Sequence, residues 1–285
     1  MIKIIKYFFE ALIIYIFFII IKFIGLRISR KVFSLIFRKV GPIIKSNKII
    51  DKNLNIFSSQ LTQEQKTKII ENMWSNYGKT FVEYMFLKKF KQDNLHMEIE
   101  NQEIIKKISN GDKPVIFISG HFANFELMSM EITKNKIDLA TIYRPLNNFF
   151  LNPFMEYLRK QYICKFQIKK GLLGLKESIN FIKKGFSIAL MVDQRLGEGD
   201  RIEFFQKKAH TTSLPAQLSL KYHLDIVPIY IERNPNDSFK VKIFNPIDTS
   251  KYKNKSELTI AINKIIEDMI SKKPDQWIWT HDRWK

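Results

Sequence analysis

The stretch that decides the fold is PVIFISGHFANFE, residues 114–126. Pro114 to Ser119 form a short continuous run of apolar and β-branched residues, which is typical of a strand buried on both faces. Gly120 ends the run, and a helix is expected to begin near Asn124. A buried strand that passes through a tight turn into a helix is the repeating unit of parallel α/β sheets.

The same pattern continues toward the end of the sequence. Further strands are predicted at 140–143 (ATIY), 186–192 (FSIALMV), 226–232 (IVPIYIE) and 239–244 (FKVKIF), with helices at 173–184, 214–222 and 256–271. Strands interleaved with helices predict an α/β fold with a mostly parallel central sheet covered by helices. In such sheets the ligand crevice lies beyond the carboxyl ends of the strands, which is where His121 falls.

The region before the first strand is expected to be helical. Over residues 47–91 apolar side chains recur at three- to four-residue spacing, and Thr62 with Gln65 has the pattern of a capping box. We therefore divide the chain into an N-terminal membrane anchor with a basic juxtamembrane segment, residues 1–45, and a folded domain, residues 46–285. That domain is expected to be helical over 46–100 and α/β over 101–285.

The anchor is expected at Tyr7 to Gly25, which is 19 residues long and apolar apart from Glu10 and Lys22. This length is close to the ~20 residues that cross a bilayer as a helix. Basic residues are denser after the segment than before it, which would keep the domain on the cytoplasmic side of a bacterial inner membrane. An interfacial helix lying flat on the membrane is an alternative, and a buried core helix is another.

The net charge of +19, from 47 Lys and Arg against 28 Asp and Glu, predicts an anionic partner such as a membrane surface, an acidic carrier or a nucleic acid. No nucleic-acid-binding motif accompanies the basic residues, and many of them flank the apolar N-terminus, so a nucleic-acid partner is not expected. The single cysteine, Cys164, offers neither an internal disulfide nor a metal cluster and is expected to be a buried apolar residue.

His121 and Glu126 are the candidate catalytic residues. In one uninterrupted helix their spacing would set the side chains ~140° apart, so they would not meet. If His121 lies in the turn and Glu126 in the first turn of the helix, the carboxylate can face the imidazole. A carboxylate-bound imidazole keeps one tautomer and can remove a proton from a hydroxyl. The alternative is a helix-capping histidine with a surface glutamate.

Five segments in the same order resemble the lipid A biosynthesis acyltransferases, the lauroyl and myristoyl transferases of Gram-negative bacteria. This family belongs to the superfamily of glycerolipid acyltransferases with a His-x4-Asp/Glu motif. The matching segments are GHFANFE, NLNIF with MWSNYGKTFVEY, YRP at 143–145, DQ at 193–194 and PDQWIWTHDRW at 274–284. The family usually has Gly at the position of Ala123 and Trp at that of Phe125. Arg195 stands where an acidic or small residue often follows DQ.

The resemblance implies a reaction. A fatty acyl chain would pass from acyl carrier protein to a hydroxyl of a lipid A precursor, an anionic glycolipid. No further cofactor, no metal and no covalent acyl-enzyme is expected. His121 would be the general base with Glu126 as its partner. Asn124, Arg144, Asp193 and Gln194 would bind substrate, with Arg144 suited to a phosphate.

Two alternatives remain open. An acyltransferase acting on a glycerophospholipid or another glycolipid fits the same superfamily, although its Glu-Gly-Thr-Arg block is absent here. A non-catalytic, basic membrane-binding protein would keep the anchor and have no use for His121. The sequence gives neither the acyl chain length nor the acyl position. The closing Trp277, Trp279 and Trp284 are expected to complete a core, with a membrane-interface role as the alternative.

Overall fold

The computed structural model describes residues 2–45, 47–197 and 199–285. Its strands are β1 (Met97–Glu100), β2 (Ile116–Ser119), β3 (Leu139–Tyr143), β4 (Phe166–Lys169), β5 (Ser187–Met191), β6 (Asp200–Phe204), β7 (Lys207–Thr211), β8 (Ile226–Arg233) and β9 (Phe239–Ile243). Its α-helices are α1 (Ile2–Ile24), α2 (Leu26–Ile44), α3 (Asn47–Phe57), α4 (Gln63–Glu83), α5 (Leu87–Gln92), α6 (Gln102–Ser109), α7 (Glu126–Lys134), α8 (Asn152–Tyr162), α9 (Leu172–Lys183), α10 (Leu214–Tyr222) and α11 (Lys255–Lys272). Short 3-10 helices are η1 (Tyr84–Phe86), η2 (Thr249–Lys251) and η3 (Pro274–Gln276).

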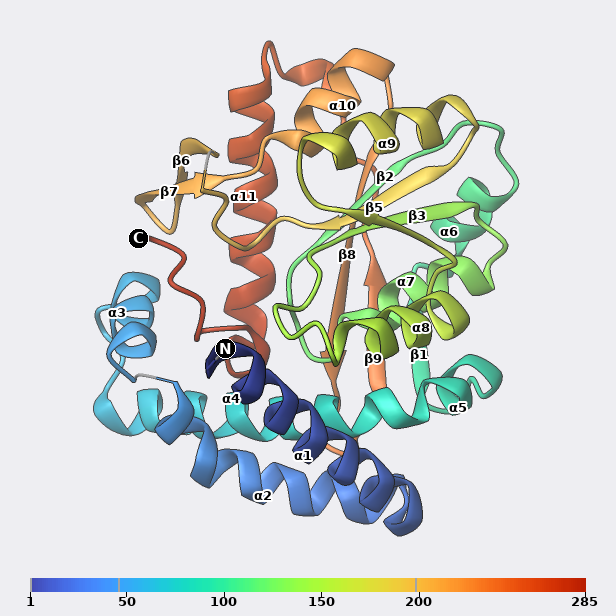
Figure 1. The fold of residues 1–285 in the computed structure, drawn as a ribbon. Coiled ribbons are helices and arrows are strands. Elements are labelled where there is room, and N and C mark those ends of the chain that lie inside the picture. The colour runs from blue at the N-terminus through green and yellow to red at the C-terminus, as the bar shows by residue number, and fades with distance from the viewer. Residues whose placement is uncertain (1, 46, 198) are drawn as a thin grey trace.

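The centre of the molecule is a sheet with the strand order β1-β9-β8-β2-β5-β3-β4, flanked by helices (Figure 1). The pairs β8/β2, β2/β5, β5/β3 and β3/β4 are parallel, whereas β9 runs antiparallel to β8. The predicted fold class, a mostly parallel sheet covered by helices, is therefore confirmed. All residues of β2 are buried, which agrees with the continuous apolar run from which the strand was predicted.

The strands that sequence patterning missed are short and polar. β1 and β4 lie at the two ends of the sheet, where one edge of a strand has no neighbour, and their sequences MEIE and FQIK carry charged and amide side chains. Polar edge strands are common because they discourage pairing with other chains. They lack the apolar run by which the buried strands were recognised. β1 also brings strand structure into the segment 46–100, which was expected to be helical.

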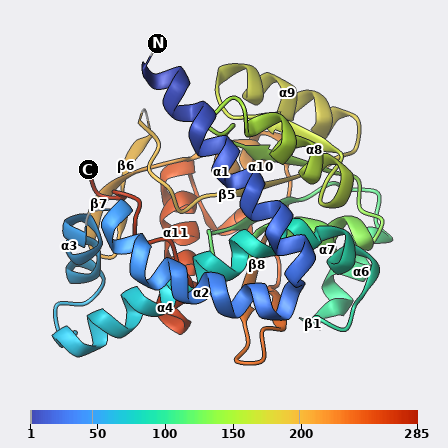
Figure 2. The same ribbon diagram turned by 60° about the horizontal axis from the view of Figure 1, so that its bottom comes forward.

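Residues 2–45 form two helices that share the core of the domain. α1 and α2 are separated by Gly25, whose φ of 85° lies in the left-handed region that favours glycine. Ala11, Phe18 and Ile21 of α1 are buried, and the Tyr15 hydroxyl donates to the Phe150 carbonyl at 2.9 Å. Figure 2 shows α1 lying along the body. α1 is long and apolar enough to cross a membrane.

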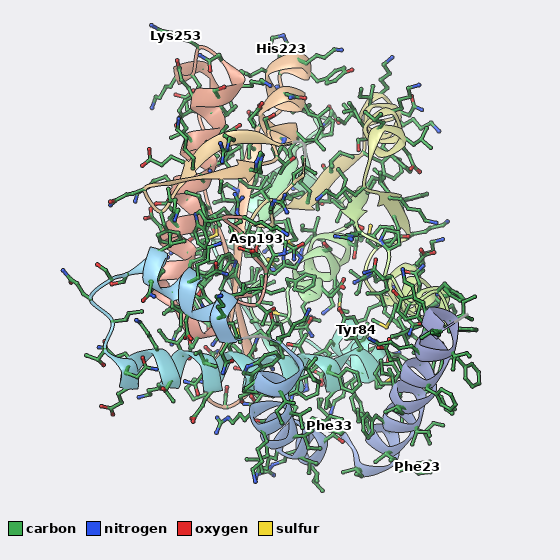
Figure 3. The ribbon with its side chains drawn as sticks, turned by 60° about the vertical axis from the view of Figure 1, so that its left-hand side comes forward. Phe23, Phe33, Tyr84, Asp193, His223 and Lys253 are labelled. Carbon is green, nitrogen blue, oxygen red and sulfur yellow. The ribbon has the colours of Figure 1, made fainter. Side chains whose placement is uncertain are left out.

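α2 packs against α4, the helix that begins with the predicted capping box between Thr62 and Gln65. The two helices approach closely at Gly78, where an added Cβ would lie 2.3 Å from the carbonyl oxygen of Phe33. In Figure 3, Phe33 and Phe23 mark the helical layer at one end of the molecule, while Asp193 lies near the middle. α4 thus joins the N-terminal helices to the sheet and brings polar side chains under the strand ends.

The C-terminal aromatic residues complete the core, as expected. Trp277 and Trp279 stack edge to face with ring centroids 4.6 Å apart, and both are fully buried. The adjacent Arg283 is buried as well, where it donates to the His210 carbonyl and the Thr211 hydroxyl. Cys164 is also buried, in agreement with its expected apolar role. The C-terminal segment therefore belongs to the interior and not to an exposed membrane face.

Candidate active site

The candidate site lies where four neighbouring parallel strands end. His121 follows β2, Asp193 follows β5, Arg144 follows β3 and Lys170 follows β4. Parallel strands present their carboxyl ends at one edge of a sheet, so these side chains gather there. A cavity of about 180 Å³ opens at this edge. It is lined by His121, Phe125, Glu126, Ser129, Thr141, Ile142, Tyr143, Arg144, Arg159, Ile163, Gln167, Lys170, Ala189, Leu190, Met191, Gln194, Thr212 and Leu214.

The register of β2 and β5 sets the His121–Asp193 pair. Ser119 pairs with Met191, and each of the two functional residues comes two positions later on its own strand. Asp193 Oδ1 lies 2.7 Å from His121 Nδ1, and Asp193 Oδ2 accepts the backbone N–H of His121 at 2.8 Å. The carboxylate therefore holds both the ring and the backbone of the histidine. Asp193 is shown in the interior of the molecule in Figure 3.

The Asp193 carboxylate is buried and strongly favoured in its charged form. Burial alone would raise its pKa, but the interaction with His121 and hydrogen bonds from His121 and Trp277 lower the pKa to about 2. The Trp277 indole N–H donates to Oδ2 at 2.8 Å. An ionised carboxylate accepts hydrogen bonds only, so the His121 proton is held on Nδ1 and Nε2 is left as the acceptor. Nε2 lies 3.3 Å from the side-chain amide nitrogen of Gln194.

We expected Glu126 to contact His121, and it does not. Its Oε1 accepts from Arg159 Nε at 2.8 Å, from Arg159 Nη2 at 2.6 Å and from the Tyr84 hydroxyl at 2.8 Å. The structure shows no hydrogen bond or ion pair between Glu126 and His121 within residues 2–45, 47–197 and 199–285. The reason is competition: Arg159 of α8 lies across the carboxylate, while Asp193 already occupies the imidazole nitrogen.

The turn between β2 and α7 adopts a strained conformation at Ala123. Its φ of 44° lies in the left-handed region, which costs a residue with a Cβ about 1–2 kcal/mol. The surrounding helices compensate through hydrogen bonds. Ala123 N donates to the Gln276 carbonyl at 3.0 Å, and the Ala123 carbonyl accepts from Thr80 at 3.2 Å and Asn76 at 3.4 Å. This geometry explains why a glycine would suit the position, as the resemblance to the family suggested.

Asn124 belongs to a buried ionic network and not to the cavity wall. Its amide nitrogen donates to Glu83 Oε2 at 2.9 Å, and its side chain is buried. Arg30 Nε donates to Glu83 Oε1 at 2.7 Å, and Arg233 donates to both oxygens of the same carboxylate. Although burial disfavours the charged form of Glu83, the two arginines lower its pKa overall. The network holds the amide nitrogen of Asn124, which does not line the cavity, and its role in substrate binding stays a prediction.

The loop after Asp193 is held by His281. The backbone N–H of Arg195 donates to His281 Nε2 at 2.8 Å, which requires an unprotonated ring nitrogen. Burial lowers the pKa of His281 to about 4, so the ring is neutral near pH 7. The C-terminal segment therefore supports the Asp193 loop at two points, through Trp277 on the carboxylate and through His281 on the following amide.

Of the predicted site residues, His121, Glu126, Arg144 and Gln194 line the cavity, whereas Asp193 and Asn124 are buried behind it. Asp193 is bonded to His121 and Trp277, so it orients the histidine, and its role in substrate binding stays a prediction. Sequence reasoning missed four residues around the site: Tyr84, Arg159, Lys170 and Trp277. Trp277 and Tyr84 lie in segments that resemble the family, so they could have been proposed as partners of the catalytic residues. Nothing local in the sequence marks Arg159 or Lys170.

Metal-binding residues do not cluster in the part of the chain that the structure describes: no group of three or more His, Cys, Asp or Glu side chains is placed to hold an ion.

Comparison with known proteins identifies the family. The chain belongs to the bacterial lipid A biosynthesis acyltransferases, whose family model matches residues 2–285. Among curated proteins it is 23% identical over 247 residues to the lipid A biosynthesis lauroyltransferase of Escherichia coli K12, which covers 84% of this chain and 78% of the relative. It is also 23% identical over 253 residues to the lipid A biosynthesis palmitoleoyltransferase of the same organism, covering 86% and 80%. The family expected from the sequence is confirmed.

A solved structure is also similar. The 1-acyl-sn-glycerophosphate acyltransferase of Thermotoga maritima matches 89% of this chain and 100% of its own chain, at 14% identity and a TM-score of 0.41.

Proposed function

We propose that the protein transfers a fatty acyl chain from acyl carrier protein to a hydroxyl group of a lipid A precursor, with His121 as the general base. Membership of the family supports acylation of lipid A at the level of the reaction class. The observation that carries the mechanism is the bond between Asp193 and His121 Nδ1 at the wall of the cavity. It leaves Nε2 as the basic nitrogen next to the space where an acceptor would bind.

In the proposed reaction the acceptor hydroxyl displaces Gln194 from Nε2 and donates its proton there. Its oxygen attacks the thioester carbonyl carbon and forms a tetrahedral intermediate. When the intermediate collapses, the carbon–sulfur bond breaks and the thiolate takes the proton from the imidazolium. Asp193 stabilises the imidazolium without accepting its proton, because its pKa of about 2 keeps it ionised. The products are the ester and the free carrier thiol.

Direct transfer agrees with the surroundings of the histidine. Within the described residues, no Ser or Cys side chain hydrogen-bonds to the imidazole, so no hydroxyl or thiol is prepared as a nucleophile. Cys164 is buried against the Leu139 and Phe166 carbonyls, and burial raises the pKa of its thiol. The backbone N–H groups of Phe125 and Glu126 at the start of α7 are our candidates for stabilising the oxyanion.

Glu126 is proposed to hold Arg159 in the cavity wall. Burial by itself disfavours the charged guanidinium, but Glu126 raises the pKa of Arg159 above its usual range, so the guanidinium stays charged. In this arrangement the two charges cancel and the side chains are fixed. Glu126 then contributes to the reaction through the shape and charge of the pocket and not through the imidazole.

The bacterial inner membrane is the proposed location, with the catalytic domain on the cytoplasmic side. α1 is packed against the domain through Ala11, Phe18 and Ile21, and its Tyr7 carbonyl accepts from Asn148. This packing favours the interfacial alternative over a crossing helix, with the exposed side chains of Phe9, Ile13 and other α1 residues facing the acyl chains of one leaflet. Labelling of cysteines placed along α1 from each side of sealed membranes would distinguish the two topologies.

The proposed function is tested with the full-length protein, an acyl-acyl carrier protein and a lipid A precursor, followed by mass spectrometry of the lipid. His121→Ala is expected to lose transfer by about 10²–10⁴-fold, the usual contribution of a general base. His223→Asn, at the C-terminal cap of α10 and outside the cavity lining, serves as the matched control. Unchanged transfer by His121→Ala would exclude the mechanism. Transfer to a lysophospholipid but not to the lipid A precursor would favour the glycerophospholipid alternative.

A further inference from the structure

A pair of cations at the mouth of the cavity has no role in the proton transfer described above. Arg144 and Lys170 are the first residues beyond β3 and β4, and the last residues of those strands, Tyr143 and Lys169, pair in parallel register. Lys170 N also donates to the Tyr143 carbonyl at 2.9 Å. The two strands therefore place the positively charged side chains of Arg144 and Lys170 next to each other in the cavity lining.

The other charges of the cavity do not neutralise this pair. Its lining contains the cations Arg144, Arg159 and Lys170 and a single carboxylate, Glu126. This carboxylate forms an ion pair with Arg159, in which Arg159 Nη2 lies 2.6 Å from Glu126 Oε1. Within residues 2–45, 47–197 and 199–285, neither Arg144 nor Lys170 forms an ion pair with an acidic side chain, whereas the neighbouring Lys169 lies 3.9 Å from Glu156. In the described part of the chain, the cavity mouth thus carries two positive charges without an ion-pair partner, and the buried Asp193 carboxylate acts on Lys170 only without such a contact.

The proximity of the two cations also affects the lysine itself. Burial and then the charge of Arg144 lower the pKa of Lys170, and the charge of Asp193 offsets part of this shift. An ammonium group held beside a guanidinium is stabilised when an anion binds between them. A phosphate group offers the several charged oxygens needed to accept from both side chains at once.

We infer that Arg144 and Lys170 form a subsite for a phosphate group of the substrates, and that Lys170 is a specificity residue of the transfer reaction. This inference rests on the proposed function and deepens it. Two sources present the same chemistry: a phosphate on the glycolipid acceptor, and the phosphodiester of the phosphopantetheine arm that carries the acyl group. Either would bring the reacting atoms toward His121, which lines the same cavity.

The kinetic test compares Lys170→Met and Arg144→Met with Lys169→Met, which removes the same charge one residue away from the cavity lining. Loss of a charge-assisted hydrogen bond is expected to lower kcat/KM by about 10- to 100-fold for each cavity variant, and the Lys169 control by less than about threefold. Equal effects of Lys170→Met and Lys169→Met on every substrate would overturn the inference.

Substrates without phosphate identify the source. If the acceptor phosphate binds here, Lys170→Met loses its effect on a dephosphorylated acceptor. If the donor phosphate binds here, the effect disappears with an acyl-pantetheine thioester in place of the carrier protein. An effect of full size on both phosphate-free substrates would mean that Lys170 acts in another way, and the inference would fail.

Binding without turnover separates this inference from the proposed function. Full-length protein in non-ionic detergent is titrated with glucosamine 1-phosphate and 4′-phosphopantetheine, and with glucosamine and pantetheine as phosphate-free partners. At least one phosphate-bearing probe is expected to bind about tenfold more tightly than its partner, and Lys170→Met should remove the difference. If neither phosphate-bearing probe binds more tightly than its phosphate-free partner, the subsite is contradicted even if the protein transfers acyl groups. A protein that binds phosphate but transfers nothing contradicts the proposed function alone.

Discussion

Two carboxylates lie beside the cavity, and they differ in what they hold. Asp193 accepts from the ring and backbone of His121 and from the Trp277 indole, so three N–H donors surround it. Glu126 accepts from Arg159 and Tyr84 and has no bond to the histidine. The first carboxylate fixes the tautomer of the proposed base, and the second fixes a cation in the pocket wall. A carboxylate close to a histidine in sequence is therefore not the one that orients it here.

The difference follows from the sheet. Asp193 is separated from His121 by 72 positions, yet the parallel register of β2 and β5 places the two side by side. Glu126 is near in sequence, but the left-handed turn at Ala123 and the start of α7 point its side chain toward α8. Distance along the chain is a poor guide at a strand-end site, whereas equal offset from paired strand residues is a good one.

The largest effect is expected for Asp193→Asn. Asparagine has one acceptor oxygen where the carboxylate has two, so one of the three N–H donors would face an amide N–H. The imidazole would lose its fixed tautomer, and kcat is expected to fall by about 10²–10⁴-fold. Glu126→Gln keeps an oxygen for Arg159 and Tyr84 and is expected to lose only about tenfold. Steady-state rates of the two variants decide the comparison. A Glu126→Gln enzyme as slow as Asp193→Asn would return Glu126 to the proton transfer.

The next effect concerns stability. Glu126→Ala leaves Arg159 buried without its counter-ion, which is expected to lower the free energy of unfolding by about 3–5 kcal/mol. Adding Arg159→Met removes the uncompensated charge, and most of this loss should be recovered. Denaturant unfolding of the single and double variants measures the coupling. Additive losses would show that the pair is not energetically linked.

A pH effect is expected from His281, which supports the loop of Asp193. Its pKa is lowered from 6.5 to about 4 by burial, so the unfolded chain binds the extra proton between these values. Stability should therefore fall as the pH drops from 6.5 toward 4, by about 2–3 kcal/mol. The lowered pKa of Asp193 removes stability only as the pH falls below 3.8, the ordinary pKa of an aspartate, so the two windows are separate. Thermal unfolding of His281→Asn should show a flatter pH profile between 4 and 6.5. An unchanged profile would contradict the prediction.

The smallest effect is expected at Ala123, in the turn that separates the two carboxylates. Ala123→Gly relieves the left-handed strain but gives the unfolded chain more freedom, so a net gain of about 0.5–1 kcal/mol is expected. The melting temperature should rise slightly, with transfer activity unchanged. A lower melting temperature would indicate that the Ala123 methyl group contributes packing that outweighs the strain.

Much of the fold was accessible from the sequence. The strands predicted around Ile118, Thr141, Ala189, Ile229 and Val241 are all present. The first four are largely apolar because they are mostly buried, whereas β9 alternates buried apolar residues with partly exposed lysines. β4 and the β6–β7 hairpin were missed because their polar residues carry no such signal. α10 was predicted over the residues that form it.

The site was predicted less completely. His121 was located because it follows a buried strand, and Arg144 and Gln194 were predicted from the resemblance to the family; all three line the cavity. Asp193 was not predicted as the partner of His121, because the sequence of neither strand shows that β2 pairs with β5. The Glu83 network escaped notice for a similar reason: its arginines come from α2 and β8, far apart in the chain.

The burial of Trp277 beside Asp193 also sets an order of events during protein synthesis. Asp193 waits for its indole partner, and Ala123 for the Gln276 carbonyl, until residues 274–284 have been translated. A nascent chain that lacks those residues has the histidine but not its complete support. The support of the catalytic pair is therefore complete only once the C-terminal segment has packed against the sheet.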